Sequence, residues 1–278
     1  MYDKGDQVRA YSSFRPLPPT DLVDIVLNYV GEKFPMPFEN AVDVGCGPGQ
    51  STIVLSPFFR SVLGCDVSKA QIHEANVARK ASNIDYKISR AESLPVPDES
   101  VQLLTASTCF HWLDAIAFFK EAKRVLVPGG TLAIYSSYVS YPVVGEEGKD
   151  LYLRQITDKL LHTDLKPYRS PESQEVFAHY ENVHFPFHDV TRVQDIDQTY
   201  VATVADAVGY FQSMATFQKL ITADPELAGN LLQEYQNRLL ETLGSSSPPE
   251  ITSLTFRRSY FLILCRKRDK ASEDETDF

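Results

Sequence analysis

The sequence lacks most of the features that mark exported, membrane-spanning and nucleic-acid-binding proteins. Its 278 residues contain four cysteines, with no CxxC pair and no metal-ligand spacing, so neither a disulfide framework nor a metal site is indicated. A leader and an apolar run of about 18 residues are also missing, and we therefore expect a cytoplasmic protein. The net charge of −10 argues against nucleic acid or an anionic membrane as the main partner.

The composition of the chain predicts an ordinary folded core. Apolar residues make up 43% of the sequence and aromatic residues 11%, which is enough for a single α/β domain with an embedded cap. We expect a monomer or a weak homodimer that acts on a small molecule.

A short apolar strand from Ala41 runs into a turn with glycines at alternate positions, namely Gly45, Gly47 and Gly49. Alternate glycines let a backbone turn tightly and lie against a ligand where a Cβ would collide. The next residues, 50–59, predict a helix whose first N–H groups point back at that ligand. The stretch therefore predicts a small-molecule site.

Two acidic residues narrow the chemistry of that small molecule. Asp43 lies two residues before the first glycine, where its carboxylate would repel a pyrophosphate and favour a cationic ligand. Asp66 ends the next apolar run, at the position where a carboxylate binds both hydroxyls of a ribose. Together they predict a positively charged nucleoside without phosphates.

This arrangement of acid, glycine-rich turn and second acid resembles the class I S-adenosylmethionine-dependent methyltransferases. The resemblance implies S-adenosylmethionine as cofactor and no metal. It implies a Rossmann-like, mostly parallel seven-stranded sheet with helices on both faces and a helical cap inserted after the fifth strand. The cofactor-binding residues that it implies are Asp43, Gly45, Gly47, Gly49, Asp66, Val67, Ala91, Glu92 and Thr108.

The apolar pattern agrees with such an α/β fold, because strands and helices alternate from residue 41 to residue 137. A methyltransferase domain is expected over residues 1–268, with its core at 20–138 and 251–268, its cap at about 139–250, and a disordered acidic tail at 269–278. The predicted strands end at Gly45 or span Ser61–Asp66, Ile84–Ile88, Val101–Thr108, Thr131–Ser136, Asn182–Val190 and Ile251–Arg266. The predicted helices include 21–30, Asp114–Leu126, 149–163 and most of 193–243. In the helix Asp114–Leu126 the apolar spacing predicts that Ile116, Phe119, Ala122, Val125 and Leu126 face inward.

Two further motifs resemble the trans-aconitate methyltransferase-like branch of the family. An arm with Tyr11 and Arg15 resembles one that folds over the cofactor pocket, which implies that these two residues close the site. The His-Trp-x-Asp sequence that begins at His111 is typical of the same branch. His111 is either a general base or a residue that holds its loop by hydrogen bonds. Met214, Ala215 and Phe217 depart from the branch pattern and make a more apolar acceptor wall.

Three functions remain open from the sequence. A small-molecule methyltransferase that acts on a carboxylate needs no base, because a carboxylate is already ionised at pH 7, and Arg15 could hold it. The same first possibility includes an N-, O- or S-methyltransferase, which would use His111 as base. The second possibility, a nicotinamide-dependent oxidoreductase, is disfavoured by Asp43 and by the lack of a Gly-x-Gly-x-x-Gly spacing. A protein that binds the nucleoside without catalysis is the third possibility.

Overall fold

The computed structural model describes residues 14–78, 81–137 and 139–269. The chain divides into two compact units. We call residues 16–137, 175–196 and 260–278 the sheet unit, and residues 1–15, 138–174 and 197–259 the helical unit. Tyr11 of the predicted arm and residues 270–278 of the predicted tail lie outside the described residues.

The sheet unit is built on parallel strands, as the alternating pattern predicts. Its strands lie in the order β3-β2-β1-β4-β5-β8, and β8 alone in this series runs antiparallel to its neighbour β5. Because the order reverses beside β1, the carboxyl ends of β1 and β4 flank the position where ligands bind in such sheets. The strands are β1 (Phe38–Val44), β2 (Phe59–Asp66), β3 (Ile84–Ile88), β4 (Val101–Ser107), β5 (Leu126–Ser137) and β8 (Ser253–Arg266).

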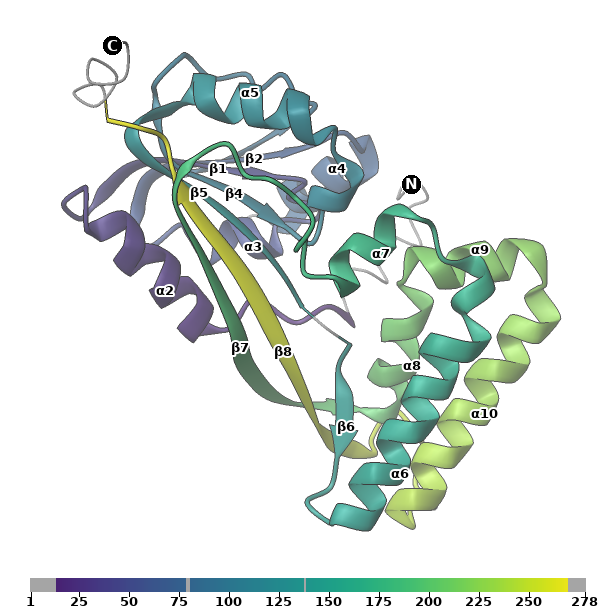
Figure 1. Cartoon of the computed structure of the whole chain (residues 1–278). Helices are drawn as coiled ribbons and strands as arrows, with labels where there is room; N and C mark the ends of the chain where they lie inside the picture. The colour runs from purple at the N-terminus through teal and green to yellow at the C-terminus, as the bar shows by residue number, and fades with distance from the viewer. Residues whose placement is uncertain (1–13, 79–80, 138, 270–278) are drawn as a thin grey trace. The chain divides into compact units, whose positions relative to one another are not determined.

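Helices cover both faces of this sheet, and Figure 1 shows α2 on one face and α5 on the other. The helices are α2 (Thr20–Gly31), α3 (Gln50–Ile53), α4 (Lys69–Ala78) and α5 (Ala115–Val125). Leu22, Val26 and Val30 of α2 are buried, as their spacing predicts. In α5 the prediction is wrong at Ile116, which is 86% exposed, while Phe118 is fully buried. The buried stripe of α5 starts at Phe118, and Ile116 lies on the opposite side of the first turn.

The helix after the glycines is much shorter than predicted. It ends at Ile53 instead of residue 59, and β2 begins at Phe59. Pro57 explains the difference, because proline lacks an N–H and disfavours helical backbone at the residue before it. The interruption lets the chain enter β2, which pairs with β1 from Phe38↔Phe59 onward.

The helical unit packs four helices around a separate apolar core. They are α6 (Glu147–Asp158), α8 (Val204–Gln212), α9 (Ala215–Ala223) and α10 (Pro225–Leu243), and α10 contacts each of the other three. The predicted helix over 149–163 is confirmed, although its last turns, Lys159–Asp164, are a π-helix. Thr203 and Asp206 form a capping box that fixes the start of α8. The short strand β6 (Tyr141–Val143) pairs with β8 in this unit.

Two parts of the later sequence fold differently from the prediction. The strand predicted at Asn182–Val190 is absent as such, and β7 instead spans His188–Thr203, including residues expected to be helical. Pro186 interrupts the predicted run, and proline is poorly tolerated inside a strand. The sheet has eight strands within the described residues, counting β6 and β7, where seven were expected. Among these residues, no helix is both long and apolar enough to cross a membrane.

Candidate active site

We call the segment Gly45–Gly49 the glycine turn. Its three glycines have backbone angles that residues with a side chain adopt only with strain. All three glycines have positive φ angles, of +61°, +55° and +93° at Gly45, Gly47 and Gly49. A Cβ on Gly45 would lie 2.7 Å from both the Cβ and the Sγ of Cys109, and one on Gly49 would collide with Tyr86. Gly45 and Gly49 are therefore favoured both by their backbone angles and by the packing around them, and Gly47 by its backbone angle alone.

Asp43 lies beneath this turn and is completely buried. Its Oδ2 accepts hydrogen bonds from the hydroxyls of Ser51 (2.6 Å) and Thr52 (2.7 Å), and its Oδ1 accepts one from Thr105 (2.7 Å). Burial raises the pKa of the Asp43 carboxyl, and these hydroxyls oppose the rise. The carboxylate thus joins β1, α3 and β4, which fixes the turn in place. Direct contact between Asp43 and a ligand stays a prediction.

Asp66 lies at the end of β2 and links the glycine turn to the start of α4. It accepts hydrogen bonds from the backbone N–H groups of Gly47 (3.0 Å) and Ser68 (2.8 Å), one on each carboxylate oxygen. Burial raises the pKa of this carboxyl, and the backbone donors oppose the rise. A carboxylate has about four acceptor positions on its two oxygens, so Asp66 retains acceptor capacity beyond these backbone donors, which suits a pair of vicinal hydroxyls. Val67, which follows, is 66% exposed.

Gln71 is a residue near the turn that the sequence did not identify as functional. Its side chain is buried, yet its Oε1 has no hydrogen-bond partner among the described residues. The same oxygen lies 3.8 Å from the place where a Cβ on Gly47 would be. A buried acceptor without a donor is costly, so this position suits a ligand that brings hydroxyl or ammonium donors. S-adenosylmethionine carries both, and the residues at the turn therefore fit it.

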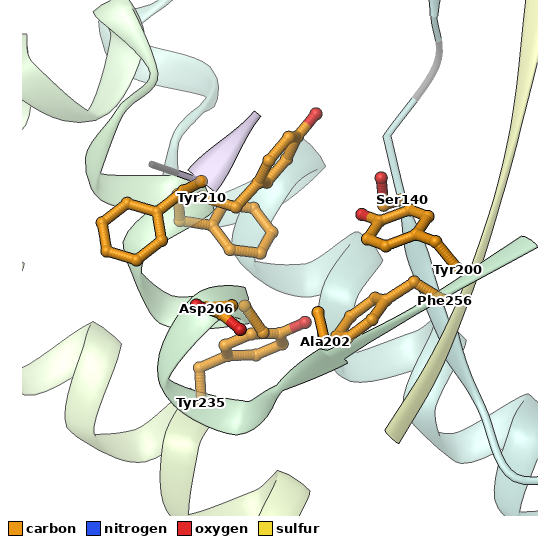
Figure 2. A pocket seen from close by; sticks show the side chains of 10 residues that line it. Ser140, Tyr200, Ala202, Asp206, Tyr210, Tyr235 and Phe256 are labelled. Atoms are coloured by element: carbon orange, nitrogen blue, oxygen red, sulfur yellow. The ribbon is translucent and has the colours of Figure 1, made fainter. Parts of the chain in front are cut away.

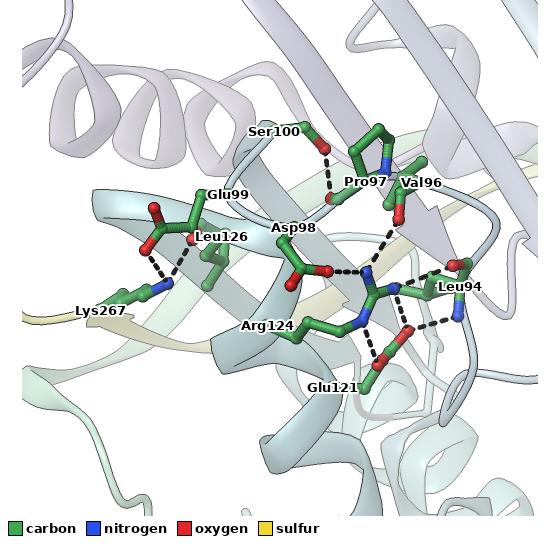
Figure 3. A network of polar contacts seen from close by, with 10 residues as sticks. All are labelled: Leu94, Val96, Pro97, Asp98, Glu99, Ser100, Glu121, Arg124, Leu126 and Lys267. Atoms are coloured by element: carbon green, nitrogen blue, oxygen red, sulfur yellow. Dashed lines mark hydrogen bonds and ion pairs between the residues drawn. The ribbon is translucent and has the colours of Figure 1, made fainter.

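The loop that follows β3 is held in place by Arg124 of α5. Its guanidinium binds both carboxylate oxygens of Glu121 (2.9 and 2.7 Å), Asp98 (2.6 Å) and the carbonyls of Leu94 and Val96 (3.0 Å each), as Figure 3 shows. The hydrogen bonds from Arg124 lower the pKa of Glu121. The loop is thus fixed without a ligand.

The two cofactor candidates on this loop lie in different surroundings. Ala91 is buried. Glu92 accepts a hydrogen bond from the backbone N–H of Asp114 (3.3 Å) and lies 3.4 Å from Arg90. Its side chain is only 16% exposed, so it is not an ordinary solvated loop acid.

The loop that follows β4 carries Thr108 and His111. Thr108 has a positive φ of 53°, which is unusual for a β-branched residue, and its N–H donates to the Tyr135 carbonyl (2.8 Å). Cys109 packs against Gly45, so this loop borders the glycine turn directly.

Tyr180 is the second residue that sequence reasoning missed, and it holds His111. Its hydroxyl lies 3.0 Å from the Nδ1 of His111, and its ring packs at 5.0 Å from Phe110 and 5.5 Å from Phe261. Burial raises the pKa of the Tyr180 phenol far above its usual value, so the hydroxyl keeps its proton. The sequence offers no signal for it, because Tyr180 lies 69 positions from His111.

The hydrogen bond between this buried phenol and Nδ1 bears on the tautomer of His111. The Tyr180 hydroxyl keeps its proton, and a buried hydroxyl needs an acceptor. When Nδ1 accepts that proton, a neutral His111 carries its own proton on Nε2. In this tautomer Nε2 is a hydrogen-bond donor, whereas a general base needs a lone pair there.

Arg15 belongs to the helical unit. Its Nε donates to the Ser213 hydroxyl (3.1 Å), and its guanidinium lies 4.5 Å from the ring centre of Tyr210. These contacts anchor the arm residue at α8. A role for Arg15 in closing the site over a cofactor stays a prediction.

Known proteins that are similar to this chain are methyltransferases. Residues 42–134 match the family described as methyltransferase domain. A Dictyostelium discoideum protein named as a methyltransferase is 28% identical over 242 residues, which cover 84% of this chain and 86% of that protein.

Solved structures extend the likeness to the fold. The structure reported as a type II methyltransferase from Anaeromyxobacter dehalogenans is 25% identical, covers 92% of this chain and 99% of its own, and has a TM-score of 0.74. A Haemonchus contortus phosphoethanolamine N-methyltransferase in complex with S-adenosylhomocysteine is 15% identical, with a TM-score of 0.50 over 96% of this chain and 58% of its own, and shares the fold. Together, the matched domain, the relatives and the fold support a class I S-adenosylmethionine-dependent methyltransferase, and S-adenosylmethionine is its cofactor.

Proposed function

We propose that this protein transfers a methyl group from S-adenosylmethionine to the carboxylate of a small molecule. The cofactor, when bound, supplies a methyl carbon on a positively charged sulfur, which is a good leaving group. The acceptor is the finer part of the proposal, and one observation carries it: the hydrogen bond between Tyr180 and the Nδ1 of His111.

In this proposal the glycine turn and its neighbours hold the cofactor. Asp66 binds hydroxyls, because its carboxylate retains acceptor capacity beyond its backbone donors. Gln71 offers its unpartnered Oε1 to a hydroxyl or ammonium group. Asp43 holds the turn and adds negative charge below it, which favours a cationic ligand. Ala91, Glu92, Val67 and Thr108 complete the proposed cofactor-binding set.

The tautomer of His111 is what favours a carboxylate acceptor. An amine, a thiol or an alcohol gives up a proton during methylation, and a nearby base would assist that loss. His111 with its proton on Nε2 is suited instead to donate a hydrogen bond to an anionic oxygen. A carboxylate oxygen already carries the electron pair that forms the new bond to the methyl carbon, so the chain removes no proton.

What remains for the protein is positioning and exclusion of water. Alignment of two reacting groups can lower a barrier by about 7 to 11 kcal/mol. The fixed loops after β3 and β4 serve this purpose, since Arg124 and Tyr180 hold them by contacts within the sheet unit.

The experiment is a screen of small carboxylic acids, amines, alcohols and thiols with isotopically labelled S-adenosylmethionine, read by product mass. We expect methyl esters, which alkali hydrolyses. The dependence of kcat/KM on pH adds a second readout. It should be nearly flat between pH 6 and 8 for a carboxylate, whereas a rise through about pH 6.5 would reveal a base. Labelled amine or thiol products together with such a rise would contradict the proposal.

Variants of His111 separate the two roles. His111→Gln keeps a side-chain donor and should keep most of the activity, while His111→Ala should lose it about 10-fold or more, since hydrogen bonds to charged groups contribute about 1.5 to 3 kcal/mol. If both variants lose activity equally and the loss follows the pH profile of a base, the donor role is wrong.

A further inference from the structure

The helical unit contains a pocket of its own, which we call the aromatic cup. The empty space in and around it, including solvent at its open mouth, is about 300 Å³, and ten residues line it. Six of them are aromatic: Phe14, Tyr200, Tyr210, Phe211, Tyr235 and Phe256. Figure 2 shows these side chains around a common space, with Ser140 and Tyr200 on one side and Asp206 on another.

The rings of the cup pack against one another. Tyr200 and Phe256 stack with their centres 5.6 Å apart, and Phe211 meets Tyr235 edge-on at 5.1 Å. Phe14 packs so closely on Gly209 that any Cβ there would collide with its ring. Flat faces held in this way favour a planar or unsaturated ligand, because such a ligand can stack on them with little loss of conformational entropy.

One end of the cup carries an unsatisfied hydroxyl. Ser140 is 5% exposed, and its Oγ makes no hydrogen bond of normal length with any residue that the structure describes. It lies close enough to the Tyr200 phenol to lower the pKa of that group, which burial raises. Because a buried hydroxyl without a partner is costly, this end of the cup suits a ligand oxygen.

The charges around the cup determine which kind of oxygen fits. Arg258 is 4% exposed and lies 5.6 Å from the Tyr200 ring centre, and Arg15 lies 4.5 Å from that of Tyr210. Both guanidinium groups create positive potential at the Tyr200 hydroxyl. That potential favours an anionic oxygen beside Ser140 and disfavours an ammonium group.

Asp206 limits the number of negative charges that the cup accepts. Its carboxylate lines the cup and is fixed by the backbone N–H of Thr203 (2.8 Å) in the capping box of α8. A second carboxylate on a ligand, placed near Asp206, would be repelled by the like charge. The cup therefore favours one anionic group at Ser140 and an apolar body, and it disfavours a second anionic group at Asp206.

We infer that the aromatic cup binds a small monocarboxylic acid with a planar apolar body, its carboxylate at Ser140 and Tyr200 and its body between the rings. That this acid is the methyl acceptor rests on the proposed function. The binding itself does not, and it can be measured without the cofactor.

The experiment measures binding by calorimetry with five probes on the full chain: benzoate, trans-cinnamate, benzamide, benzylamine and citrate. Benzoate and benzamide share their shape and differ in charge, so their ratio reports the anion preference. We expect the two monocarboxylates to bind at least 10-fold more tightly than benzamide and benzylamine, and citrate to bind weakly. Tighter binding of benzylamine than of benzoate would overturn the inference.

Variants localise the site. Ser140→Ala and Tyr200→Phe should each weaken benzoate binding about 2-fold to 12-fold, the range for one hydrogen bond. Ala202→Phe should fill the cup, which Ala202 lines, and abolish binding. The matched control is Tyr152→Phe, whose hydroxyl contacts Arg238 at the surface of the same unit and which should bind as wild type. Asp206→Asn should admit citrate more readily.

The outcomes separate this inference from the proposed function. If benzoate binds and Ser140→Ala weakens it, but no methyl ester forms with labelled cofactor, the cup stands and the proposed function fails. If methyl esters form while Ser140→Ala, Tyr200→Phe and Ala202→Phe all bind and turn over benzoate like wild type, the inference about the cup is wrong and the function stands.

Discussion

The glycine turn makes its site from the backbone, whereas the aromatic cup makes its site from side chains. At the turn, three positive φ angles and two backbone N–H groups on Asp66 define the geometry. In the cup, rings and polar groups from several helices and strands point into one space. A site made of backbone is sensitive to any substitution at its glycines, and its fixed geometry suits one particular ligand. A site made of side chains can change its specificity one residue at a time.

The largest expected effect is at the backbone site. Gly45→Ala introduces a Cβ 2.7 Å from Cys109 at a φ of +61°, which should cost about 2 to 5 kcal/mol in strain and repacking. Thermal unfolding should shift to lower temperature, and calorimetry with S-adenosylhomocysteine should show a loss of affinity of about 100-fold or more.

The control for that substitution lies in the helical unit. Gly148 is in α6 with open space around its Cβ position, so Gly148→Ala should stabilise the protein by up to about 1 kcal/mol. If Gly45→Ala and Gly148→Ala have the same stability and affinity, the glycine turn does not depend on its backbone angles.

The next effect concerns the carboxylate that links the turn to α4. Asp66→Ala removes a charged acceptor and leaves the N–H groups of Gly47 and Ser68 without it. We expect S-adenosylhomocysteine to bind about 10-fold to 100-fold more weakly. Asp24→Ala on the exposed face of α2 is the control and should bind normally. Unchanged affinity in Asp66→Ala would remove this residue from the ribose role.

A smaller effect is expected at Tyr180, which contributes a side-chain contact within the sheet unit. Tyr180→Phe keeps the ring contacts with Phe110 and Phe261 but removes the hydroxyl at His111. Turnover should fall about 2-fold to 12-fold with unchanged binding of S-adenosylhomocysteine. The freed Nδ1 should also introduce a pH dependence near neutrality. A fall in turnover without any change in the pH profile would indicate a merely structural role.

The smallest effect is on the thiols around the turn. Burial raises the pKa of Cys65 to about 12 and raises those of Cys46 and Cys109 as well. At pH 8 these thiols should not react with Ellman's reagent until the protein is unfolded. Because the folded state holds these protons more tightly, stability should fall as pH rises from about 9 toward 12. Rapid reaction of the native protein would show that the turn is open to solvent.

The parts of the fold that repeat a simple pattern could be predicted from the sequence. The β1, β2 and β4 strands lie within a few residues of their predicted bounds, because each contains a continuous run of buried residues. The β3 strand agrees with its predicted bounds although it lies at the edge of the sheet and is mostly exposed. The β7 strand was missed because most of its residues are exposed, so no alternation marks it. Ile116 was wrongly predicted to be buried, because an apolar spacing of three or four residues fits a buried face that begins at Ile116 as well as one that begins at Phe118.

The candidate site divides in the same way. The glycines and Asp66 could be found because backbone sites leave a local signature of residue types. Gln71, Tyr180 and Ser140 could not, since their importance lies in which atoms face them after folding. The sequence also identified Asp43, as a residue that contacts the ligand. It did not predict the three hydroxyl groups that bind Asp43, which come from α3 and β4.

The Arg124 cluster bears on how tightly a cofactor can be held. Hydrogen bonds from this guanidinium fix the loop that carries Ala91 and Glu92 before any ligand arrives. Association then spends little free energy on ordering that segment, and calorimetry should record a smaller entropic penalty than for a floppy loop. This gain in cofactor affinity should not depend on the acceptor, because the loop is already ordered by folding.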